Sequence, residues 1–61
     1  MAKSLRDRIL EALKKGALNR FDLFWRLGVP MRYVRDELSR LKEKGLVEYD
    51  ISTDKWHLKR K

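Results

Sequence analysis

Residues 29–45 read V-P-M-R-Y-V-R-D-E-L-S-R-L-K-E-K-G, and the apolar side chains of this stretch recur at the spacing of an α-helix. Val34, Leu38 and Leu41 fall at i, i+4 and i+7, which is one stripe of a 3.6-residue period. The arginines of the stretch lie off that stripe. We therefore predict a helix over about 31–44 that packs its apolar stripe into a core and presents arginines to solvent.

Both ends of this predicted helix carry residues that suit helix termini. Pro30 fits the first turn, because its missing N–H has no partner to lose there. Gly45 fits the left-handed position just past the end. Lys42 and Lys44 fall in the last turn, where cations interact favourably with the negative end of the helix dipole.

Two further helices are predicted before this one. Ser4 can cap a helix over about 4–15, because Asp7 follows three residues later in a near capping-box spacing. Asn19 can cap a second helix over about 20–27. Residues 17–18 between the two helices read as a short extended piece.

After the long helix the apolar period changes from 3.6 to 2, which predicts a β-hairpin. Its strands are expected at about 46–51 and 55–59, on either side of a polar turn. The side chains expected to cover the open side of the helices are Val47, Ile51, Trp56 and Leu58. The fold class is therefore α+β, with three helices and a C-terminal hairpin in a single domain, 1–61.

Composition narrows the functional classes. The 61 residues carry a formal net charge of +7, which favours a polyanionic partner, although a solvated charge-rich surface gives the same total. The chain has no cysteine, and the lone His57 cannot form a four-ligand metal site, so no metal or other cofactor is expected.

No apolar run is long enough to span a bilayer and no signal peptide is visible, so we expect the protein to lie in the cytoplasm. The chain has no glutamine and one asparagine beside many charged residues, as heat-adapted proteins do.

Catalytic patterns are missing from the sequence. There is no glycine-rich phosphate loop, and the serines have no base near them in the predicted fold. The carboxylates are scattered among lysines and arginines and balance charge. We therefore expect a binding protein and not an enzyme.

The order and spacing of these segments resemble the winged helix-turn-helix family, in particular compact archaeal and bacterial transcription regulators. Residues 22–30 resemble the family pattern D-L-x-x-x-L-G-[IV]-S, although Pro30 stands where the family often has a serine or threonine cap. The helix at 31–44 resembles x-V-x-x-x-L-x-x-L, and 44–48 reads K-G-L-V-E. The resemblance covers nearly all of residues 4–58.

The resemblance implies sequence-specific binding of double-stranded DNA by a small transcription regulator. The helix at 31–44 would lie in the major groove, and the hairpin at 46–59 would contact the backbone or the minor groove. By position, the candidates for base contacts are Met31, Arg32, Arg35, Asp36 and Ser39. The candidates for phosphate contacts are Arg20, Arg40, Lys55 and Lys59. Asp36 and Glu37 have an alternative role as i, i+4 ion-pair partners of the neighbouring arginines.

A narrower group within the family binds left-handed duplexes. Val29, Pro30 and Trp56 resemble that group. However, Arg35 and Ser39 stand where it has asparagine and tyrosine, which argues against the left-handed form.

An alternative function is a winged helix that binds another protein within a larger complex, since fold alone does not separate the two functions. Phe21 and Trp25 lie four residues apart on one helical face that the core does not need, and Trp25 departs from the polar residue usual in the family. Exposed aromatic residues of this kind are typical of an interface, including that of a homodimer. The competing interpretation is that the helix at 4–15 or the N-terminal tail covers Trp25.

Overall fold

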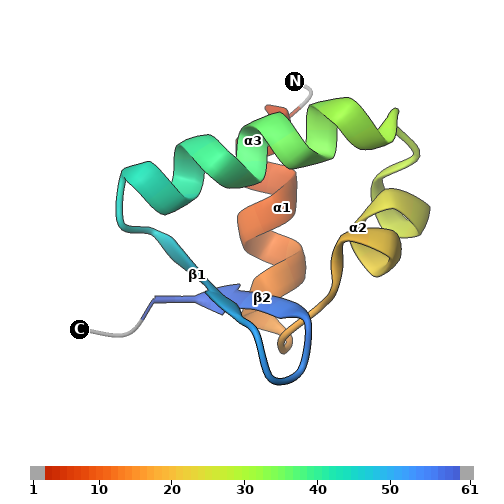
Figure 1. The fold of residues 1–61 in the computed structure, drawn as a ribbon. Coiled ribbons are helices and arrows are strands. Elements are labelled where there is room, and N and C mark those ends of the chain that lie inside the picture. The colour runs from red at the N-terminus through yellow and green to blue at the C-terminus, as the bar shows by residue number, and fades with distance from the viewer. Residues whose placement is uncertain (1–2, 60–61) are drawn as a thin grey trace.

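The computed structural model describes residues 3–59, and these form three helices followed by a two-stranded antiparallel hairpin (Figure 1). The elements are α1 (Leu5–Lys14), α2 (Arg20–Leu27), α3 (Met31–Glu43), β1 (Val47–Asp50) and β2 (Lys55–Leu58). The predicted α+β class and element order are confirmed, and each predicted boundary is met to within one residue. Within the described residues, no helix has the length and apolar character that crossing a membrane requires.

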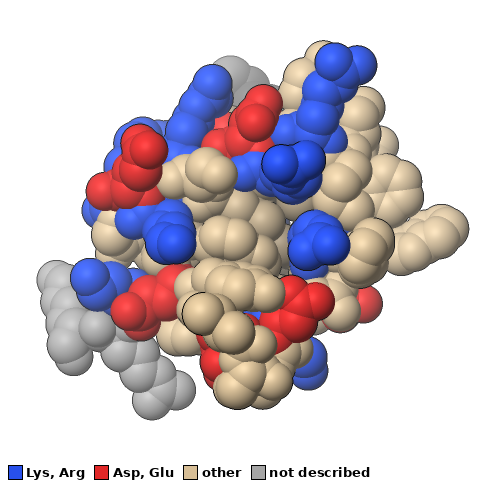
Figure 2. Space-filling model, viewed as in Figure 1, with Lys and Arg blue, Asp and Glu red and all other residues tan. Residues whose placement is uncertain are grey.

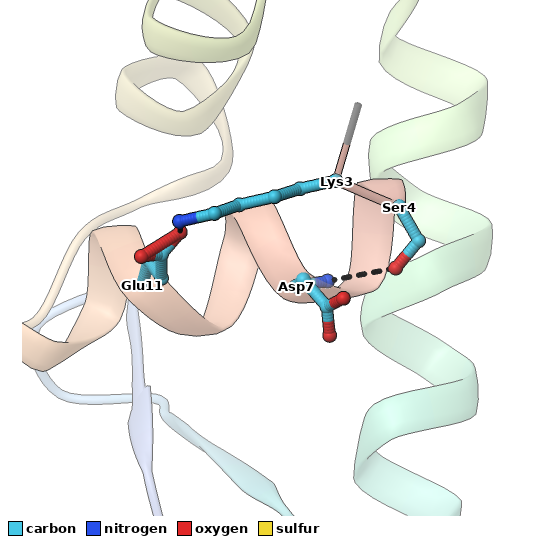
Figure 3. Close-up of polar contacts among 4 residues, drawn as sticks. All are labelled: Lys3, Ser4, Asp7 and Glu11. Carbon is cyan, nitrogen blue, oxygen red and sulfur yellow. Dashed lines mark hydrogen bonds and ion pairs between the residues drawn. The ribbon is translucent and has the colours of Figure 1, made fainter. Parts of the chain in front are cut away.

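The two predicted N-terminal caps are present. At α1 the Ser4 hydroxyl accepts a hydrogen bond from the Asp7 N–H at 3.2 Å (Figure 3). At α2 the Asn19 side chain accepts one from the Asp22 N–H at 2.8 Å. Each cap satisfies an N–H that would otherwise lack a partner at a helix start, which is why both helices begin there.

A second polar contact lies along α1. The Lys3 ammonium pairs with the Glu11 carboxylate two turns along the helix (Figure 3). This hydrogen bond, together with the positive charge of Lys3, lowers the pKa of the Glu11 carboxyl. Both groups are well exposed, so the pair fixes the start of α1 more than it stabilises the fold.

The core is built around the apolar stripe of α3. Val34, Leu38 and Leu41 are almost completely buried, as predicted. In Figure 1, α3 runs across the top of the view and α1 passes behind it, with α2 at the right and the hairpin below. The remaining buried side chains come from these elements, and they are Ile9, Leu13, Leu23, Leu27 and Val47.

A short turn joins α2 to α3. Gly28 ends α2 in the left-handed conformation with φ 67°, and its N–H donates to the Phe24 carbonyl at 3.0 Å. Pro30 lies at the N-cap of α3, one residue before the first turn in which it was predicted. Its carbonyl oxygen accepts from the N–H groups of Tyr33 and Val34. The turn therefore sets the position of α3 relative to α2 with only three residues.

The hairpin is anchored to the helices by the predicted extended piece at 17–18. Leu18 and Trp56 exchange two backbone hydrogen bonds, with N···O distances of 3.0 and 2.7 Å. β1 pairs with β2 so that Val47 lies opposite Leu58 and Tyr49 lies opposite Trp56. Trp56 and Leu58 pack against the core while remaining half-exposed.

The prediction that Ile51 covers the helices is wrong. β1 ends at Asp50, and Ile51 lies in the turn with 84% of its surface exposed. The Asp50 carboxylate accepts from the N–H and the hydroxyl of Ser52, at 3.0 and 2.6 Å, and this local turn replaces the next step of the strand. The two hydrogen bonds also lower the pKa of the Asp50 carboxyl.

Two substitutions in the hairpin test this arrangement. Val47→Ala should lower the free energy of unfolding by about 2 kcal/mol, because Val47 is 1% exposed and its truncation leaves a cavity. Ile51→Ala should change it by less than about 0.5 kcal/mol, because its side chain is in solvent. Urea denaturation at 25 °C measures both. Equal losses would place Ile51 in the core after all.

Candidate nucleic-acid interface

The outward face of α3 is a ridge of polar side chains opposite the buried stripe. A helix advances by about 100° per residue, so Arg32, Arg35, Asp36 and Ser39 fall within about 100° of one another around its axis. All four are exposed. The prediction that the arginines of this helix face solvent is confirmed, and these four candidates for base contacts lie together.

The other two candidates on α3 lie at the two edges of this ridge. Met31 is half-buried and packs against the core, so it belongs to the base of the ridge. Arg40 lies beside Asp36 at the edge away from the groove, and its guanidinium is 3.6 Å from the carboxylate of Glu37, three residues earlier in the helix. Within residues 3–59, no ion pair shorter than 4 Å involves Asp36, so the i, i+4 support considered for that carboxylate is absent.

A groove of about 610 Å³ lies between α2, α3 and the hairpin. It brings together five of the predicted site residues, which are Arg20 and Phe21 of α2 and Met31, Arg35 and Ser39 of α3. Lys42 and Tyr49 also line the groove, and the sequence analysis did not identify them as site residues. For Lys42 the signal was present, because it follows Arg35 by seven residues and Ser39 by three and so shares their flank.

The groove is cationic. Arg20, Arg35 and Lys42 line it, and the described lining includes no carboxylate. The Arg20 guanidinium carbon lies 4.8 Å from the centroid of the Phe21 ring, within cation–π range. Figure 2 shows apolar and uncharged side chains between α3 and the hairpin, with lysine and arginine side chains around them. This arrangement attracts anions to the flank of α3.

The hairpin carries a different charge balance. Lys55 and Lys59, both predicted to contact phosphates, are exposed but do not line the groove. Lys55 lies opposite Asp50 in the strand register. Glu48, Asp50 and Asp54 outnumber the two lysines in the described part of the hairpin, and Figure 2 shows acidic side chains on both sides of it.

Tyr49 is held at the edge of the groove from two sides. Its hydroxyl donates a hydrogen bond to the Asp54 carboxylate, and its ring centroid lies 5.1 Å from that of Trp56. Asp54 adopts the left-handed conformation with φ 55°, which aspartate tolerates better than most residues. The hydrogen bond and the negative charge of Asp54 raise the pKa of Tyr49 above its ordinary value of 10.0.

The predicted aromatic interface residues are exposed. Trp25 has 80% of its surface in solvent and Phe21 has 51%. The interpretation that α1 covers Trp25 is therefore wrong, while residues 1–2 of the N-terminal tail, the other cover considered, lie outside the described residues. The Trp25 ring packs edge-to-face on Phe24 with centroids 5.7 Å apart. Phe21 lines the groove and Trp25 does not.

No family model, curated protein or solved structure matches the chain. Within residues 3–59, no three histidine or acidic side chains come close enough to hold a metal ion. The exposed ridge of α3 and the cationic groove beside it are the features from which a function can be argued.

The contact between Tyr49 and Asp54 can be tested by titration. In a Tyr33→Phe background Tyr49 is the only tyrosine, and its absorbance change should report a pKa above 10.0. Asp54→Asn, which also tolerates the left-handed conformation, should bring the pKa back toward that value. Because the pKa of Tyr49 is higher in the folded state, its contact with Asp54 stabilises the fold fully below the unfolded pKa of about 10. That stabilisation is lost as the pH rises through the folded-state pKa. An unchanged pKa in Asp54→Asn would show that the carboxylate does not hold the ring.

Proposed function

We propose that the chain is a winged helix-turn-helix domain that binds double-stranded DNA sequence-specifically, as a small transcription regulator. The observation that carries the proposal is the exposed ridge of α3, in which Arg32 and Arg35 project from a helix whose opposite face is buried. The major groove is about 12 Å wide and admits one α-helix. The order of three helices and a hairpin agrees with this family. The cytoplasmic location expected from the sequence is part of this proposal, in line with the resemblance to archaeal and bacterial regulators.

The residue types on the ridge suit the reading of base edges. Arg32 and Arg35 can each donate two hydrogen bonds to a guanine, which discriminates by about 1–3 kcal/mol against the wrong base. Asp36 has no ion-pair partner among the described residues and can accept from a cytosine amino group. Ser39 can donate or accept at either kind of base edge.

Phosphate contacts in this proposal come chiefly from the helices. Arg20 lies at the start of α2 and lines the groove beside α3. The hairpin adds Lys55 and Lys59, while its three carboxylates keep the rest of it away from the phosphates. Such contacts fix the position of the protein on the duplex and carry no sequence information.

Binding to duplex DNA should weaken steeply with salt. If the protein neutralises Z phosphates, log K should fall with log salt at a slope of about −0.9Z. Arg35→Ala should weaken binding to a sequence selected from a random pool by about 1–3 kcal/mol more than it weakens binding to random DNA. Lys59→Ala should weaken binding to both DNAs equally. Fluorescence anisotropy at several salt concentrations measures all of these.

Arg26→Ala is the matched control, because Arg26 lines a hollow formed with α1 and not with α3. Arg26→Ala removes the same charge and should leave unchanged the ratio of the affinities for selected and random DNA. A flat salt response would reject binding through phosphates. Equal losses for Arg35→Ala on selected and random DNA would remove Arg35 from the base-reading set.

The second candidate function is a protein-interaction module, including self-association, and the exposure of Trp25 and Phe21 favours it. An exposed tryptophan beside a half-exposed phenylalanine is the composition of an interface core. The two functions are compatible for a dimer centred on Trp25, because Trp25 does not line the groove beside α3. Two half-sites about 34 Å apart in the selected DNA would be the sign of such a dimer.

Sedimentation tests the self-association. The weight-average mass should rise with protein concentration, and Trp25→Ala should abolish the rise with little change in melting temperature, because its ring is mostly in solvent. Ile51→Ala, which removes another exposed apolar side chain at 84% exposure, is the control and should leave the mass unchanged. A monomer mass at every concentration of the unmodified chain would contradict a dimer.

A further inference from the structure

The groove beside α3 contains three aromatic rings that the reading of a duplex does not require. Phe21, Tyr49 and Trp56 come from α2, β1 and β2 and line the same hollow. Tyr49 and Trp56 lie with centroids 5.1 Å apart and a tilt of 49°, and 51% of the Phe21 surface is exposed. In an intact duplex the faces of the bases are stacked on one another. Rings at this position can therefore stack on a base only where a nucleotide is unpaired.

We propose that this groove binds an unpaired nucleotide, as found in a single-stranded tail next to a duplex. The base would pack against Phe21, Tyr49 and Trp56, and its phosphates would lie near Arg20 and Lys42, which leaves Arg35 to the duplex. This inference rests on the proposed function, because α3 would hold the double-stranded part of the same DNA. Aromatic side chains beside basic ones are the general means of binding single strands without sequence preference.

The charges and size of the groove favour this occupant. Arg20, Arg35 and Lys42 line the groove, and the described lining has no carboxylate. The charge of the groove is therefore complementary to a polyanion. Its volume of about 610 Å³ lies in the range of pockets that hold small organic ligands, about 300–1,000 Å³. Leu38 also lines the groove but is only 1% exposed, so the aromatic rings supply the apolar surface for a base.

The rings are also held in place before any ligand arrives. The backbone of Trp56 is fixed by two hydrogen bonds to Leu18, and its side chain packs against the core. Tyr49 is held by the hydrogen bond from its hydroxyl to Asp54. The charge of Arg20 is close enough to Tyr49 to oppose the rise in the pKa of its hydroxyl. A guanidinium and an aromatic ring therefore lie within reach of the same nucleotide.

Trp56 provides the signal for the test. In a Trp25→Phe background it is the only tryptophan, so a base that stacks on it should quench the fluorescence. A blunt DNA duplex is compared with the same duplex carrying a short tail of unpaired thymidines, and with one carrying an abasic tail of equal length. The thymidine tail should tighten binding by about tenfold and quench Trp56. The abasic tail adds the sugar–phosphate backbone without bases, so it should give a smaller gain in affinity and less quenching of Trp56.

Phe21→Ala should remove most of the gain from the thymidine tail. Tyr33→Ala is the matched control, because Tyr33 is 52% exposed with an arginine 5.8 Å from its ring but lies outside the groove. Tyr49→Leu provides a second variant in the groove. Circular dichroism checks that each variant folds.

The outcomes separate this inference from the proposed function. Equal affinity for blunt and tailed duplexes, an equal gain from the abasic tail, or a gain that survives both Phe21→Ala and Tyr49→Leu would overturn the groove site and leave duplex binding standing. Absence of binding to the blunt duplex at low salt would overturn the proposed function. Quenching of Trp56 by a thymidine strand alone would then still support the groove.

Discussion

The burial of one stripe of α3 is the constraint on which the surface of this protein depends. Val34, Leu38 and Leu41 are at most 1% exposed, and full burial of such side chains contributes about 1.5–3 kcal/mol each. In a chain of 61 residues without cysteine, that contribution is a large share of the total stability. Because the helix is rigid, fixing this stripe also fixes the opposite side. The outward direction of Arg32 and Arg35 is a consequence of the core.

The groove depends on a second constraint, the attachment of the hairpin. Two strands of four residues are marginal by themselves. Here the backbone pairing of Leu18 with Trp56 and the burial of Val47 hold them against the helices. Trp56 thus joins the core, the hairpin and the groove, so that the position of the aromatic rings follows from the same contacts that stabilise the fold.

Charge is distributed unevenly over these elements. The flank of α3 that faces the groove carries Arg35 and Lys42, with Arg20 across from them. The hairpin is richer in carboxylates than in lysines. This distribution would attract a polyanion to one side of the molecule and repel it from part of the hairpin, and so would orient the proposed complex.

The sequence by itself determined the helices, their caps and the outward arginines, because helical period and capping are local signals that need no distant partner. Tertiary structure decided the rest. Ile51 was expected inside, but the turn formed by Asp50 and Ser52 stopped the strand before it. Tyr49 became a groove residue, and Trp25 remained exposed, only through the packing of segments far apart in the chain. Spacing along a chain fixes which residues share a face of one element, but distances between elements are set by how their side chains pack.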